Sequence, residues 1–66
     1  MYLNTLELRA LQTDKERLAA LPSVSCIDWD IVSLWAEQTT DSKIREIFQR
    51  KAIDLSIREE YLCEMQ

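Results

Sequence analysis

The side chains with most chemical potential in this sequence are two cysteines and two pairs of closely spaced carboxylates. Cys26 lies near a predicted helix N-terminus, where the helix dipole favours a reactive thiolate. The chain contains no His and no Gly, so it lacks an imidazole base for that thiol and a Gly-rich loop for phosphate. Cys26 and Cys63 fit no metal-ligand spacing. We interpret Cys26 as a small buried apolar side chain, because free Cys is among the most buried residue types.

The carboxylate pairs also fail to form a recognisable centre. Asp28 and Asp30 are two residues apart and diverge on a helix, which excludes a close acid–base pair from that element. Glu60 and Glu64 share a helical face, but no second set of oxygen ligands for a hard cation can be identified. The sequence therefore predicts a non-enzymatic protein with no catalytic residue, metal, cofactor or small-molecule substrate.

Helices must position these side chains, because the composition favours no other element. The chain has one Pro and is rich in Leu, Ala, Glu, Lys, Arg and Gln, which lose little rotamer freedom in a helix. Its 66 residues leave room for one small domain. We predict an all-α fold, a single three-helix domain over 1–66 made of a helical hairpin and a long C-terminal helix. The predicted helices cover about 4–21, 26–38 and 41–65.

The first predicted helix contains an alternative. Asn4 can cap its start, with Glu7 three residues later, and Pro22 ends it. A second capping pattern at 13–16 would break the helix near Gln12 into two short pieces. We favour one unbroken helix, because helical phase then places five apolar residues on one broad face. These residues are Leu3, Leu6, Ala10, Leu18 and Leu21.

The predicted helix 26–38 is apolar on two sides. The stripe expected to face the core consists of Ile27, Ile31, Leu34 and Trp35. The opposite side carries Trp29, Val32 and Ala36. A helix with this pattern is packed between its neighbours or against another chain.

The predicted helix 41–65 repeats the pattern. The stripe expected to face inward consists of Ile44, Ile47, Phe48, Ala52, Leu55 and Leu62. A second stripe, Ile53, Ile57 and Tyr61, follows at i, i+4 and i+8 on a separate face. A short first helix cannot cover both faces of so long a helix, and large exposed apolar patches usually mark interaction sites.

These second stripes predict that the chain binds another protein or itself. A core of this size seldom supplies more than about 3–5 kcal/mol without disulfides, a metal or oligomerisation. We predict a regulator, adaptor or small chaperone-like subunit, completed by oligomerisation or a partner. The predicted contact residues are Trp29, Val32, Ile53, Ile57 and Tyr61. Two alternatives remain: a structural homodimer with no other client, and a monomer in which these side chains complete the core.

The charge distribution weighs against a nucleic-acid partner. Eight Lys and Arg against twelve Asp and Glu give a net charge of −4, which is opposite to that of a phosphate-binding surface. A basic cluster at 43–51 leaves one alternative, a dimeric helical DNA-binding regulator. Its four cations point in different directions around a helix, so they form no single basic face.

The sequence favours a cytoplasmic location. No apolar run approaches the roughly 20 residues that a membrane-spanning helix needs. The N-terminus has neither the basic start nor the long apolar core of a signal peptide. Two cysteines are also fewer than a small disulfide-stabilised secreted scaffold usually carries. We therefore expect no membrane partner.

Overall fold

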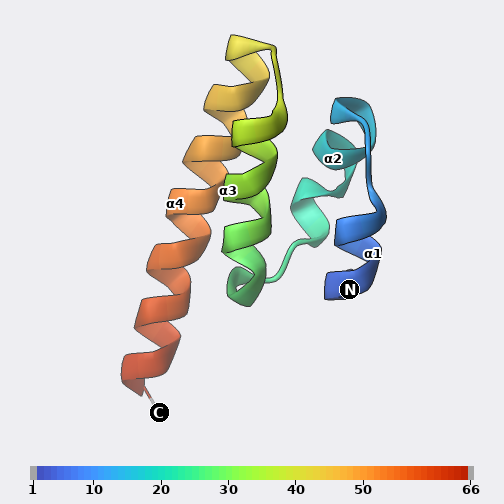
Figure 1. Cartoon of the computed structure of the whole chain (residues 1–66). Helices are drawn as coiled ribbons and strands as arrows, with labels where there is room; N and C mark the ends of the chain where they lie inside the picture. The colour runs from blue at the N-terminus through green and yellow to red at the C-terminus, as the bar shows by residue number, and fades with distance from the viewer. Residues whose placement is uncertain (1, 66) are drawn as a thin grey trace.

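The fold is all-α, as predicted. The computed structural model describes the backbone of residues 2–65 and the side chains of residues 2–62, and all regular structure in this part of the chain is helical (Figure 1). Four α-helices in these residues are joined by short connections, and the connection between α2 and α3 contains two single turns of 3-10 helix. The elements are α1 (Thr5–Ala10), α2 (Asp14–Ala20), η1 (Leu21–Ser23), η2 (Cys26–Asp28), α3 (Trp29–Gln38) and α4 (Ser42–Met65).

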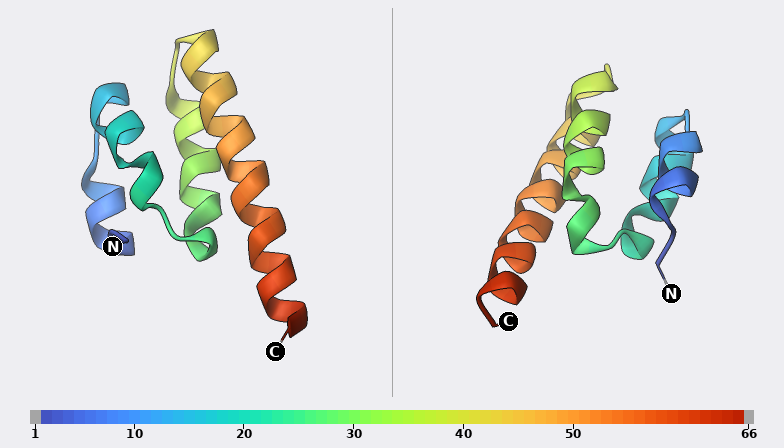
Figure 2. Two further views of the ribbon diagram at one scale, coloured as in Figure 1. Left: turned by 180° about the vertical axis from the view of Figure 1, so that it is seen from behind. Right: turned by 60° about the horizontal axis from the view of Figure 1, so that its bottom comes forward.

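The helices form two arms that meet at α3. One arm is the antiparallel pair of α3 and α4, joined by a tight turn at residues 39–41. The other is residues 2–25, which we call the N-terminal arm. In this arm the chain turns back after α1, so that α2 runs toward the start of α1. In three orientations α3 lies between this arm and α4 (Figures 1 and 2). Because α4 has 24 residues and α3 has 10, the C-terminal half of α4 extends past the end of its neighbour.

The prediction of one unbroken helix over 4–21 is wrong. Residues 11–13 interrupt it, and the second capping pattern is formed in addition to the predicted cap at Asn4, whose Oδ1 accepts from the backbone N–H of Glu7 at 2.8 Å. The backbone N–H of Glu16 donates to Thr13 Oγ1 at 3.2 Å, and the Thr13 hydroxyl donates to Glu16 Oε1 at 2.9 Å. This cap satisfies an amide that would otherwise be unpaired at the start of α2.

Packing explains why the break is preferred to a continuous helix. Folding back allows Leu8 of α1 and Ala20 of α2 to enter the same core, which a straight helix of this length could not do. Arg17 secures the bend, because its Nε and Nη2 donate to the Leu11 carbonyl at 3.2 and 3.0 Å. The same guanidinium lies 5.6 Å from the ring centroid of Trp35, within cation–π range.

The other two helices agree with their predicted bounds. The segment predicted as 26–38 is one turn of 3-10 helix followed by α3, and the segment predicted as 41–65 is α4. Asp41 begins α4 as its cap, because Asp41 Oδ1 accepts from the backbone N–H groups of Lys43 and Ile44 at 2.9 and 3.2 Å.

The core faces of α3 differ from the predicted stripes. Ile27 and Leu34 are exposed although they were expected inside, and Val32 and Ala36 are buried although they were assigned to the outer side. The reason is that α3 packs against α4 on one side and the N-terminal arm on the other, so its core face lies between the two stripes. The buried side chains of α3 are Ile31, Val32, Trp35 and Ala36.

The centre of the core is an aromatic pair. Trp35 of α3 and Phe48 of α4 meet edge to face, with ring centroids 5.7 Å apart and an interplanar angle of 60°. The buried residues that α4 contributes are Phe48, Ala52 and Leu55 from its predicted inner stripe, whereas Ile47 and Leu62 of that stripe are exposed. The N-terminal arm adds Leu8, Ala20, Leu21 and Val24.

Two side-chain hydrogen bonds attach the N-terminal arm to the rest of the fold. The Thr5 hydroxyl donates to Asp28 Oδ1 at 2.9 Å, and the Thr39 hydroxyl donates to Asp14 Oδ2 at 2.8 Å. Asp28 and Thr39 are both buried, so these bonds also satisfy groups that would be costly to leave unpaired. The two bonds hold the arm at opposite ends of α3 and thereby set its position relative to α4.

Candidate partner-binding surface

An exposed apolar stripe runs along the outer face of α4. We call Ile53, Ile57 and Tyr61 the outer stripe; their exposed fractions are 60%, 59% and 64%. The cause is geometric, because α4 turns Phe48, Ala52 and Leu55 toward the core and no helix covers the side of α4 that faces away from it. Exposure of these three side chains agrees with the prediction that this face is not used by the core.

Trp29 extends the outer stripe onto α3. It is half-buried, and together with Ile53 it lines a shallow hollow of about 160 Å³ between α3 and α4. The structure therefore brings together two predicted contact residues that are 24 positions apart in the sequence. The rest of the lining consists of Ser33, Gln49, Ala52 and Ser56.

Val32 is not part of this surface. Its side chain has an exposed fraction of 0% and belongs to the core cluster with Ile31 and Trp35. A partner cannot reach it without unfolding the chain, so its prediction as a contact residue is wrong. The error has the same cause as the other differences on α3. The side of α3 that was assigned to a partner packs against α4 and the N-terminal arm.

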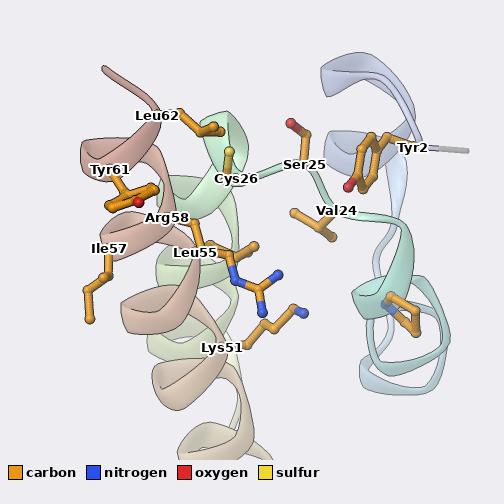
Figure 3. A pocket seen from close by; sticks show the side chains of 11 residues that line it. Tyr2, Val24, Ser25, Cys26, Lys51, Leu55, Ile57, Arg58, Tyr61 and Leu62 are labelled. Atoms are coloured by element: carbon orange, nitrogen blue, oxygen red, sulfur yellow. The ribbon is translucent and has the colours of Figure 1, made fainter. Parts of the chain in front are cut away.

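A larger groove separates the N-terminal arm from the C-terminal half of α4 (Figure 3). Its volume is about 670 Å³. One wall is formed by residues 51–62 of α4 and the other by residues 2 and 22–26. The lining residues are Tyr2, Pro22, Val24, Ser25, Cys26, Lys51, Leu55, Ile57, Arg58, Tyr61 and Leu62.

Sequence reasoning missed this groove, because no pattern in the chain places residues 2 and 22–26 opposite α4. The position of Tyr2 depends on the extended start of the chain, where the backbone N–H of Leu3 donates to the carbonyl of Ser23 at 2.9 Å. The one available signal was the seven-residue spacing of Lys51 and Arg58, which puts both on one face of a helix.

The groove has two cations on an otherwise apolar wall. Lys51 and Arg58 extend from α4 toward the N-terminal arm, whereas Ile57 projects away at the edge (Figure 3). Arg58 Nε lies 3.4 Å from Asp54 Oδ2 in an exposed ion pair, which offsets part of its charge. Among the side chains of residues 2–62, no acidic one lines the groove, although the chain carries a net charge of −4. The groove is thus locally cationic on an acidic protein.

The groove and the outer stripe form one continuous surface. Ile57 and Tyr61 belong to the outer stripe and also line the groove. From Ile53 to Tyr61 the stripe crosses α4 from the hollow beside Trp29 to the edge of the groove. Four of the five predicted contact residues therefore lie on a single surface.

Cys26 is half-buried at one end of the groove, with a free thiol. The expectation that it is buried in the core is therefore corrected: it packs against the edge of the core and lines the groove. The side chains of Cys63 and Glu64 lie outside the described residues. Among residues 2–62, no group of three or more Cys, Asp or Glu side chains is placed to hold a metal ion.

The basic cluster at 43–51 is partly used by the fold itself. Arg45 donates from Nε to the Ala36 carbonyl at 3.3 Å and from Nη2 to the Thr39 carbonyl at 2.8 Å, which satisfies the C-terminal end of α3. Arg50 pairs with Glu46 at 3.1 Å on the exposed face of α4. Two of the four cations are therefore engaged in contacts within the chain.

Of the helices in residues 2–65, none is both long and apolar enough to cross a bilayer.

No similar protein indicates a role for this surface. Comparisons of the chain with models of known protein families, with curated proteins and with solved structures found no match.

Proposed function

We propose that this chain is a small non-enzymatic protein-binding module, acting in the cytoplasm as a regulator, adaptor or chaperone-like subunit. The observation that carries the proposal is the outer stripe, whose three large apolar side chains are more than half exposed on one helix. Exposed aromatic and aliphatic residues at helical spacing are the anchors with which helices bind partners.

The proposed contact surface consists of Trp29, Ile53, Ile57 and Tyr61. Trp29 and Ile53 surround a hollow that a partner side chain can enter, and Tyr61 offers both an apolar ring and a polar hydroxyl. The partner is a different protein or a second copy of this chain. A homodimer formed through α4 would bury the same outer stripe on both subunits.

The test is the substitution Ile57→Asp at the centre of the outer stripe. A carboxylate buried in an apolar interface is strongly unfavourable, so association should be lost. Helix content should stay close to that of the wild type, because Ile57 contributes little to the core. Light scattering of the purified chain measures self-association. Affinity capture from a lysate of the native cells, with and without nuclease, measures binding to other proteins.

Leu6→Asp provides a matched control. Leu6 is exposed on α1, and the substitution introduces the same charge in place of a similar side chain far from the outer stripe. The proposal predicts that Leu6→Asp retains association. Equal loss in both variants would show a nonspecific effect of charge, and collapse of the circular dichroism signal in Ile57→Asp would place that residue in the core; either result refutes the proposal. Capture that depends on nucleic acid would favour the alternative of a DNA-binding regulator.

A further inference from the structure

We propose that the groove between the N-terminal arm and α4 binds an acidic amphipathic segment of the partner protein. The partner's apolar side chains would pack between Leu55, Leu62 and Tyr2, and its carboxylates would pair with Lys51 and Arg58. This inference rests on the proposed function and specifies the chemistry of the partner.

Charge complementarity selects an acidic occupant. Among residues 2–62, the only charged residues that line the groove are Lys51 and Arg58, and both extend from α4 toward the N-terminal arm (Figure 3). A basic segment would meet two like charges there, which disfavours binding. Long cationic side chains also present apolar stems, so Lys51 and Arg58 can contact apolar groups of the partner while their charged ends pair with its carboxylates.

The size and shape of the groove suit a chain segment. Its volume of about 670 Å³ lies within the range of about 300–1,000 Å³ found for ligand pockets. Tyr2 and Tyr61 on opposite walls and Leu62 at one end are each more than half exposed, so the groove is open to solvent along its edge. An open apolar groove bounded by a helix admits the apolar face of an amphipathic segment.

Nucleic acid is a weaker candidate for the same cations. Proteins that bind duplex DNA neutralise several phosphates, about 6–10 in well-studied cases, whereas this groove offers two cations, one of them paired with Asp54. Most of its lining is apolar or aromatic. These features fit an occupant that carries both apolar side chains and a few carboxylates.

The experiment uses three fluorescently labelled peptides with blocked ends and the same pattern of Leu residues at helical spacing. They differ only in the intervening residues, which are Glu, Gln or Lys. Fluorescence anisotropy with the full chain measures their affinities at about 50 and 300 mM NaCl. The Glu peptide should bind most tightly and the Lys peptide most weakly, and added salt should weaken the Glu peptide, because screening reduces attraction between exposed charges.

The decisive variant is K51E/R58E, with K15E/K43E as its control. Both pairs change the net charge by the same amount, and Lys15 and Lys43 are exposed positions outside the groove. The Glu peptide should lose at least tenfold in affinity for K51E/R58E and less than threefold for K15E/K43E. If the charge-reversed chain folds poorly, the neutral variant K51Q/R58Q replaces it, because that variant adds no new charges to α4. Its affinity for the Glu peptide should show an intermediate loss.

Several outcomes would overturn the groove proposal. Equal binding of the Glu and Lys peptides, equal loss in both charge-reversed variants, or no binding of any peptide up to about 1 mM would each do so. Binding of a DNA duplex that disappears in K51E/R58E would assign the cations to phosphates instead.

The two proposals can fail separately. If Ile57→Asp abolishes capture of a partner and K51E/R58E does not, the protein-binding function stands and the groove proposal fails. If neither variant changes capture while the Glu peptide still binds in a charge-dependent manner, the groove is a peptide site and the outer stripe is not a docking surface.

Discussion

A comparison of Val32→Ala with Ile53→Ala tests the placement of these two residues directly. Both were predicted from sequence as partner contacts, but Val32 is fully buried and Ile53 is 60% exposed. Val32→Ala removes two carbons, which costs about 1.6 kcal/mol at about 0.8 kcal/mol per buried CH₂. A residual cavity of roughly 50 Å³ adds about 1 kcal/mol, and the higher helix propensity of Ala returns about 0.5. The net expected loss is about 2 kcal/mol.

The expected loss for Ile53→Ala is about fourfold smaller. Three carbons are removed, but only two-fifths of the side chain is buried, so the transfer contribution is about 1 kcal/mol. Ala again improves helix propensity, which reduces the net loss to about 0.5 kcal/mol. A chain of this size has a total stability of about 3–10 kcal/mol. The Val32 variant should therefore lower Tm by about 8–16 °C, whereas the Ile53 variant should lower it by only a few degrees.

Urea unfolding followed by circular dichroism and tryptophan fluorescence measures both free energies of unfolding. The dependence of the free energy on urea should be the same in the two variants and the wild type, since neither changes the surface exposed on unfolding appreciably. Measurements at several protein concentrations separate intrinsic stability from self-association through the outer stripe. The reasoning is refuted if Val32→Ala lies within about 0.5 kcal/mol of the wild type. It is also refuted if Ile53→Ala costs as much as Val32→Ala under monomeric conditions.

Two further substitutions test how the N-terminal arm is held. Thr13→Ala should cost about 1 kcal/mol in urea unfolding because α2 loses its cap, while Thr13→Ser should retain most of the stability; identical values for the two would contradict the capped break. Arg17→Met keeps an apolar stem but removes two hydrogen bonds and the contact with Trp35, so stability should fall by about 1–3 kcal/mol with a change in tryptophan fluorescence. Unchanged stability and fluorescence would show that Arg17 is not holding the bend.

Helix type and most helix ends could be predicted from local signals. Asp41 is a good capping residue, and the inner stripe of α4 repeats at helical spacing through Phe48, Ala52 and Leu55. These features depend on residues within one or two turns of each other, so no knowledge of the packing is needed to interpret them. The exposure of the outer stripe was predictable for the same reason. One face of a helix serves as its main core face, so a second apolar stripe on a separate face remains exposed.

The break at residues 11–13 shows where local signals become insufficient. The capping pattern at Thr13 was visible in the sequence, but so was a continuous apolar face, and the two favour different structures. The choice depends on whether Leu8 and Ala20 reach the core of the α3–α4 pair, which is a long-range contact. The cap is worth about 1 kcal/mol, so burial of side chains from both short helices is needed to decide the outcome.

The sequence by itself determined the all-α class, the ends of α3 and α4 and the outer stripe on α4, because helical periodicity and capping act over a few residues. Only the tertiary structure decided that Val32 is buried, since that depends on which helices lie on either side of α3. It also decided the groove, whose walls come from residues 2 and 22–26 and from residues 51–62. Contacts between segments so distant in sequence form only when the whole core packs, and no local sequence pattern predicts them.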